Sequence, residues 1–168
     1  MRSRKRLSIK HLPFFVTINT HQRRRIFADY RWAKLLQNIF WHKKNYLKYT
    51  LKAYVIMPDH YHAIIKPPTK YRIGDVIRHI NGSFAREYNL SSKKHGQVFQ
   101  RDFYDHIIRN DKDMIIKIEY ILNNPRRAGL VENYKHYRYL FAYHLRRKQD
   151  FRLRGSHIHP ARSRKSMW

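Results

Sequence analysis

Residues 49–66, YTLKAYVIMPDHYHAIIK, decide the fold because they predict two strands that pair across a tight turn. The two runs 49–57 and 60–66 are rich in aromatic and β-branched residues, which favour strands. Between them, Pro58-Asp59 suits the centre of a type I turn, since proline presets φ at the first central position. Pro67-Pro68 then ends the second strand. The sequence therefore predicts a β-hairpin in the middle of the chain.

Periodic apolar residues predict further elements on both sides of this hairpin. Recurrence at helical spacing indicates amphipathic helices, and runs of aromatic and β-branched residues indicate strands. The predicted elements are a strand over 12–20, a helix over about 30–46, a helix over about 72–90, one or two short strands within 97–109, and packed irregular or short helical structure over 134–143.

A third helix is predicted from residue 111, because Asn110 is a good N-cap and acidic residues follow it. It should end near Pro125, since the residue before a proline disfavours helical backbone. The order strand, helix, hairpin, helix, strand, helix predicts an α+β sandwich, with a mostly antiparallel sheet covered by helices. A ferredoxin-like arrangement is the simplest topology for that order.

Chain length and charge distribution divide the sequence into one domain and a tail. We expect a single domain over residues 1–144, which includes a basic arm at 1–10. Residues 145–168 carry eight Lys or Arg against one Asp and few apolar residues, so they predict a mobile basic tail.

The overall charge points to a polyanionic partner. Lys and Arg total 37 against 11 Asp and Glu, a net charge of +26, while 42% of residues are hydrophobic. The hydrophobic residues are enough for a packed core. The positive charge attracts nucleic acid through phosphate contacts and counterion release. An anionic membrane surface is the alternative, but no lipidation motif, signal peptide or membrane-spanning run is present in the sequence. Without cysteine, disulfides and Cys-ligated zinc are excluded. Because the sequence shows neither a signal peptide nor a membrane-spanning run, we expect a soluble intracellular protein.

His60 and His62 form the first candidate site. On a strand, residues i and i+2 point to the same face, so both imidazoles should lie side by side with Tyr61 pointing away. Imidazole is the commonest metal ligand. Chance is the competing explanation, because about one His-x-His pair is expected among 12 histidines. The second pair, His157 and His159, lies in the predicted tail, and we interpret it as incidental.

Tyr120 is the second candidate, because it lies away from the apolar stripe of the third helix. At about 100° per residue, Tyr120 falls almost opposite the centre of that stripe, and Asn124 lies one turn after Tyr120 on the same side. A surface tyrosine and a capping asparagine are the alternatives. The stripe itself comprises Met114, Ile115, Ile118, Ile121 and Leu122.

These groups together could break a phosphodiester. A phenol has an ordinary pKa near 10 and needs activation by a metal, a base or cations before it attacks. A divalent ion held by His60, His62 and an oxygen ligand would polarise the phosphate; manganese, zinc or, less typically, magnesium suits such ligands. Attack by Tyr120 would leave a 5′-phosphotyrosine and a free 3′-hydroxyl. Three alternatives remain open: Tyr104 as the nucleophile, a metallonuclease that uses water, and a non-catalytic nucleic-acid-binding module.

Three motifs resemble those of one family. The stretch VIMPDHYH (55–62) resembles the signature of the HUH single-tyrosine transposases. The stretches FQRDFYDHIIRN (99–110) and YILNNPRRAGLV (120–131) resemble one branch of them, the REP-associated tyrosine transposases. The likeness covers roughly residues 10–140 in the right order, although Phe99 stands where many members have tryptophan. The Arg-rich end after Leu145 lies outside the resemblance.

The resemblance implies a fold, an activity and a set of site residues. It implies a ferredoxin-like HUH domain that cleaves and joins single-stranded DNA at hairpins of repetitive extragenic palindromes. By motif position, His60 and His62 would ligate magnesium or manganese, Tyr120 would be the nucleophile, and Asn124 would be the third, polar ligand. It further implies a bacterial cytoplasmic protein, associated with the nucleoid through DNA.

Basic residues should contact the DNA backbone, while aromatic residues stack on unpaired bases. We expect single-stranded or hairpin DNA as the partner, no membrane, no organic cofactor, and a monomer or homodimer. For each basic residue the alternative is a solvated surface charge. The candidate phosphate contacts are Arg4, Lys5, Arg6, Arg23, Arg24, Arg25, Arg101 and Arg109.

Overall fold

The predicted hairpin is the centre of the fold. The computed structural model describes residues 12–143, so the predicted arm at 1–10 and the predicted tail at 145–168 lie outside the described residues. Strand β2 (Thr50–Met57) pairs antiparallel with β3 (His60–Lys66), and Met57 lies opposite His60. A bulge between Leu51 and Ala53 shifts the register near the start of β2. The prediction of strands, turn and pairing is confirmed.

The hairpin belongs to a five-stranded antiparallel sheet of order β4-β1-β3-β2-β5. Strand β1 (Phe14–Asn19) pairs with β3 on one side and with β4 (Tyr104–Ile107) on the other. The first four strands thus have the order 4-1-3-2 that the ferredoxin-like prediction requires. Both predicted strands around the hairpin exist, and an isolated bridge joins Thr20 to Phe99 ahead of β4.

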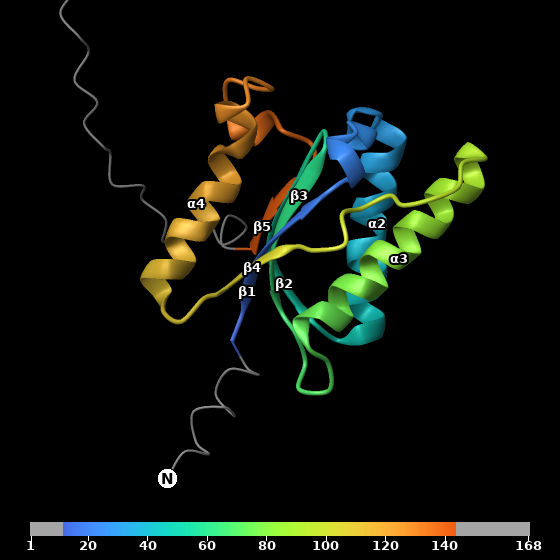
Figure 1. Ribbon diagram of the computed structural model, residues 1–168. Helices are drawn as coiled ribbons and strands as arrows, with labels where there is room; N and C mark the ends of the chain where they lie inside the picture. The colour runs from blue at the N-terminus through green and yellow to red at the C-terminus, as the bar shows by residue number, and fades with distance from the viewer. Residues whose placement is uncertain (1–11, 144–168) are drawn as a thin grey trace, which may run out of the picture.

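Helices cover both faces of the sheet (Figure 1). Helices α2 (Tyr30–Leu47) and α3 (Ile73–Ser92) lie on one face, and α4 (Asp111–Arg127) lies on the other. Because side chains alternate along a strand, each face has its own apolar layer. The layer under α2 and α3 contains Phe40, and the layer under α4 contains Ile121. The α+β sandwich is confirmed. None of the helices in residues 12–143 is long and apolar enough to cross a membrane.

The sequence did not predict the edge strand β5 (Leu140–Ala142), which pairs with β2. The segment before it contains the single helical turn η3 (Tyr134–His136), so the expected short helical structure is present there. Three residues are too few to show an alternating pattern, and the hydrogen bonds of β2 hold them in place. Two more helical turns, η1 (His21–Arg23) and η2 (Ile26–Ala28), connect β1 to α2.

Helix α4 differs from the prediction at Pro125 and Ile115. It continues through Pro125 to Arg127, because the buried proline ring packs in the core and the amide of Ala128 still bonds to the carbonyl of Asn124 at 3.0 Å. A proline in the last turn therefore removes one hydrogen bond without ending the helix. Ile115, placed on the apolar stripe, is 41% exposed, because it lies at the rim of that stripe rather than at its centre.

Candidate active site

Strand β3 brings the two histidines together on the face that α4 covers. Their Nε2 atoms lie 3.2 Å apart, and the ring centroids lie 4.8 Å apart. Tyr61, between them, is fully buried in the opposite layer, where its hydroxyl bonds to Asn81 Oδ1 at 2.8 Å. The alternation expected from the sequence is therefore observed.

Two oxygen atoms orient the imidazoles from behind. Asp59 Oδ1 lies 2.6 Å from Nδ1 of His60, and Thr17 Oγ1 lies 2.8 Å from Nδ1 of His62. Arg23 Nε contacts the other Asp59 oxygen at 3.1 Å. When Asp59 accepts the Nδ1 proton of His60, the Nε2 atom of that ring keeps its lone pair. Both Nε2 atoms therefore face one shared point, the arrangement that a cation requires.

Burial keeps both imidazoles in the neutral form that binds metals. Desolvation lowers the pKa of His60, although the hydrogen bond and charge of Asp59 act in the opposite direction. Desolvation also lowers the pKa of His62 to about 3, and the charges of His60 and Arg23 add to the effect. At neutral pH neither ring carries a proton on both nitrogens, so both can act as ligands.

Tyr120 faces this histidine pair from α4. Its ring centroid lies 5.1 Å from that of His62 and 5.6 Å from that of Phe15, with both contacts edge-on. The ring remains 39% exposed, so it lies at the border of core and solvent. The helical wheel placed Tyr120 almost opposite the core, but a wheel gives the direction of Cβ and not the reach of a long side chain. The structure brings Tyr120 and His62 together, as the hypothesis requires.

The amino-terminal end of α4 is held by two side-chain interactions. Asn110 Oδ1 accepts a hydrogen bond from the amide of Asp113 at 2.9 Å, as the predicted N-cap should. The Asp113 carboxylate also contacts His106 Nε2 of β4 at 2.8 and 3.0 Å. This second contact ties the helix to the sheet two turns before Tyr120. The position of the phenol therefore depends on β4 as well as on the apolar layer.

A pocket of about 310 Å³ lies beside Tyr120 and His62. Tyr104 lines it as well, because Tyr104 and His62 both lie opposite Thr17 in the sheet and so share its face. The structure thus places the alternative nucleophile at the same pocket, with 58% of its surface exposed. Sequence reasoning missed Thr17 and Lys117 as lining residues, since only the strand register and the helix orientation bring them here. The complete lining is Phe15, Thr17, His62, Tyr104, Lys117 and Tyr120.

Two cations of α4 lie close to the pocket and to Tyr120. Lys117 lines the pocket one turn earlier on α4, with its Nζ atom 5.1 Å from the centroid of Phe15. The guanidinium of Arg127 lies 5.8 Å from the centroid of Tyr120. Positive charge at these positions favours an anionic phosphate in the pocket.

The histidines offer two ligands to a metal, and the predicted third ligand is the amide oxygen of Asn124. Within residues 12–143, no three His, Cys, Asp or Glu side chains gather as metal ligands. Asn124 is half-buried on α4, and its side chain has no hydrogen-bond partner in the part of the chain that the structure describes. Within residues 12–143 its amide oxygen is therefore uncommitted, and no hydrogen bond joins it to the histidines. Two neutral imidazoles with an amide oxygen fit a divalent cation such as manganese.

The predicted phosphate contacts have different surroundings. Arg23 pairs with Asp59 beside the histidines, whereas Arg24 donates to the carbonyls of His21 and Gln97 and so holds its own loop. Exposed guanidinium groups are found at Arg25, Arg101 and Arg109, while Arg4, Lys5 and Arg6 lie outside the described residues.

Comparison with known proteins gives consistent matches. The family model described as Transposase IS200 like matches residues 8–124. A Haemophilus influenzae protein whose name assigns it to the REP-associated tyrosine transposases is 32% identical over 99 residues, which cover 52% of this chain and 55% of that protein. The REP-associated tyrosine transposase of Escherichia coli is 28% identical over 129 residues, 76% of this chain and 74% of the relative.

A solved structure has the same fold. It is that of a REP-associated tyrosine transposase bound to a REP hairpin, and it superimposes with a TM-score of 0.65 at 24% identity. The superposition covers 79% of this chain and 77% of the other. The resemblance to this branch, stated from the three motifs, is confirmed.

Proposed function

Because the chain belongs to the family of IS200-like transposases, we propose that it cleaves and rejoins single-stranded DNA with Tyr120 as its nucleophile. The observation that carries this proposal is the convergence of Tyr120 on the histidine pair, with ring centroids of Tyr120 and His62 5.1 Å apart. We propose hairpins of repetitive extragenic palindromes as the substrate. Relatives named for these elements, and a structural neighbour bound to such a hairpin, support that choice.

The cleavage step is a transesterification at phosphorus. The Tyr120 oxygen attacks the phosphate, a new O–P bond forms, and the bond from phosphorus to the 3′ oxygen breaks. The phenol loses one proton and the departing 3′ oxygen gains one. Because the new O–P bond replaces the broken one, the phosphoester energy is conserved and no external energy source is needed. The product is a 5′-phosphotyrosine that a later 3′-hydroxyl can attack to rejoin a strand.

The residues around Tyr120 prepare this step. His60 and His62 would hold a divalent ion through Nε2, with Asn124 supplying an amide oxygen. Magnesium or manganese bound there would polarise the phosphate and stabilise charge on the leaving oxygen. Asp59 and Thr17 fix the imidazole orientations at 2.6 and 2.8 Å. Lys117 in the pocket lining and Arg127 beside the Tyr120 ring supply positive charge, which attracts the phosphate and stabilises charge on its oxygens.

A covalent-adduct assay tests the proposal. The full chain is incubated with labelled single-stranded palindromic DNA and Mn²⁺, and the products are separated under denaturing conditions. We expect a protein–DNA adduct that is lost in Tyr120→Phe, because phenylalanine lacks the attacking oxygen. Tyr104→Phe is the matched control, since it removes a hydroxyl from the same pocket and should keep the adduct.

Each other outcome contradicts the proposal in a specific way. An adduct that survives Tyr120→Phe and is lost in Tyr104→Phe assigns the nucleophile to β4. Cleavage without any adduct indicates a metallonuclease that activates water. Tight binding with neither cleavage nor adduct indicates a binding module of the same fold.

A further inference from the structure

We infer that a pocket at the start of β2 is a second nucleic-acid site, which takes an unpaired nucleotide of the DNA strand that reaches Tyr120. The inference rests on the proposed function, because that function supplies the single-stranded substrate. It concerns the opposite end of β2 from the histidine pair, where no residue of the candidate active site lies.

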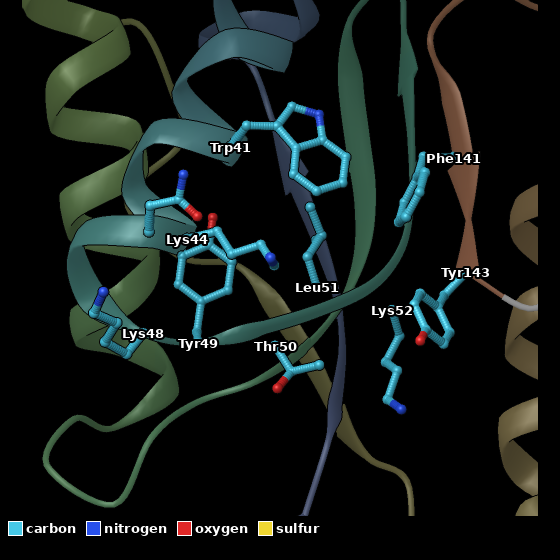
Figure 2. A pocket seen from close by; sticks show the side chains of 10 residues that line it. Trp41, Lys44, Lys48, Tyr49, Thr50, Leu51, Lys52, Phe141 and Tyr143 are labelled. Carbon is cyan, nitrogen blue, oxygen red and sulfur yellow. The ribbon is translucent and has the colours of Figure 1, made fainter.

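Aromatic side chains build the wall of this pocket. It has a volume of about 570 Å³ and lies between the end of α2, the start of β2, and β5 (Figure 2). Buried Tyr49 and Leu51 form its floor. The rings of Trp41 and Phe141 meet edge to face with centroids 5.0 Å apart, and Tyr143 adds a ring that is 47% exposed. A nucleobase can stack on aromatic surface of this kind.

Three lysines interleave with these rings. Lys44 Nζ lies 5.6 Å from the Trp41 centroid, Lys52 Nζ lies 5.8 Å from the Tyr143 centroid, and Lys48 completes the lining. The lining contains no acidic residue, and no carboxylate within residues 12–143 pairs with any of the three lysines. Within that part of the chain, no ion pair neutralises their charges, which suits the binding of an anion. Rings that alternate with cations match the bases and phosphates of a single strand.

The concave shape of the pocket favours a nucleotide over partners with a flat anionic surface. A flat anionic surface, such as a membrane or an acidic protein face, could reach the lysines but not the buried floor at Tyr49 and Leu51. The volume is of the size that holds one small ligand. A single unpaired nucleotide, with its flanking phosphates at the rim, fills both the aromatic wall and the cationic edge.

The distance along β2 sets the length of DNA involved. Thr50 lines the pocket, and Met57 lies opposite His60 at the other end of the strand. Seven residues at about 3.3 Å each separate the two ends by roughly 23 Å. This is the minimum separation, because the pocket lies beside α2 and the histidines lie on the face that α4 covers. One strand must therefore extend several nucleotides beyond the cleaved phosphate to occupy both places. The pocket would then select substrates that carry a single-stranded flank.

Salt dependence of binding tests the lysines. Binding of labelled oligothymidylate long enough to span both sites is measured by fluorescence anisotropy at several salt concentrations, in Tyr120→Phe without divalent metal. We compare Lys44→Gln/Lys48→Gln/Lys52→Gln with Lys34→Gln/Lys93→Gln/Lys94→Gln, which removes equal charge from exposed positions elsewhere. Each lost phosphate contact lowers the slope of log K against log salt by about 0.7. We expect a loss of about 2 for the pocket variant and little for the control.

Tryptophan fluorescence tests the aromatic wall directly. The chain has three tryptophans, so Trp32→Phe/Trp168→Phe leaves Trp41 alone. We expect oligothymidylate to quench Trp41, and we expect the quenching to disappear when the three pocket lysines are replaced. A far-ultraviolet circular dichroism spectrum unchanged from that of the parent verifies folding of each variant.

Equal salt slopes for the two triple variants, or no quenching of Trp41 by the long strand, overturn the inference. Quenching by anionic lipid vesicles but not by DNA assigns the pocket to a membrane and also overturns it. These measurements need neither metal nor cleavage, so their failure is distinguishable from failure of the proposed function, which the adduct assay reports.

Discussion

Replacing Asp59 with asparagine tests whether the orientation of the His60 ring matters, because both histidines stay in the protein. The Asp59 carboxylate lies 2.6 Å from His60 Nδ1 and 3.1 Å from Arg23 Nε. Asparagine keeps the size of the side chain and the turn at Pro58, but it loses the charge that holds the proton on Nδ1. The Nε2 lone pair of His60 is then no longer fixed toward His62.

The expected loss of metal affinity follows from the role of a carboxylate that is hydrogen-bonded to a ligating histidine. Removing the carboxylate behind a ligating histidine typically lowers metal affinity by about 10- to 100-fold. That range equals about 1.4–2.8 kcal/mol of binding free energy. Isothermal titration with Mn²⁺ should show this loss, and adduct formation should require more Mn²⁺ and recover when Mn²⁺ is saturating.

Asp75→Asn is the matched control for this experiment. Asp75 also pairs with an arginine, Arg78 at 3.0 Å, but it lies on α3, on the other face of the sheet. We expect unchanged Mn²⁺ affinity in this variant. The reasoning is refuted if Asp59→Asn binds Mn²⁺ as tightly as the parent, or if saturating Mn²⁺ fails to restore the adduct.

Two further predictions concern stability. In metal-free protein, the pKa of His62 is lowered to about 3 by burial, so below pH 6.5 the unfolded chain takes up a proton that the folded chain refuses. The free energy of unfolding should fall by up to about 1.4 kcal/mol per pH unit from pH 6.5 down toward pH 3. In urea titrations, the free energy of unfolding of His62→Asn should depend less steeply on pH than that of the parent. An equal pH dependence in both proteins would contradict the assignment of this effect to His62. Ile121→Ala should lower the free energy of unfolding by about 2–5 kcal/mol, because Ile121 is fully buried. Ile115→Ala should lower it by less than about 0.5 kcal/mol, because Ile115 is exposed. Similar losses for the two variants in urea denaturation would argue against the observed orientation of α4.

Local sequence patterns predicted most of the fold. Strand β3 has the predicted bounds of His60 to Lys66, and α2 and α3 end within two residues of their predicted limits. These elements carry strong periodicity and clear turn residues, which depend only on neighbours in the chain. Strand β5 has neither, because its three residues are ordered by pairing with β2 far away in sequence.

The candidate site depends on pairing that no local pattern contains. Alternation along β3 was enough to predict that His60 and His62 share a face. The wheel gave the right centre for the buried stripe, but it missed the contact of Tyr120 with Phe15, because that contact depends on where α4 crosses the sheet. The register of β4 against β1 places Tyr104 opposite Thr17, and only this register brings a second tyrosine to the pocket.

Mass spectrometry of the trapped adduct tests the identity of the nucleophile most directly. Trypsin separates the two candidates, because Tyr120 falls in the peptide 118–126 and Tyr104 in the peptide 102–109. After nuclease digestion, the account predicts a nucleotide joined through its 5′-phosphate to Tyr120 in the first peptide. A nucleotide on Tyr104, or an unmodified peptide 118–126 from protein that has cleaved its DNA, would contradict it.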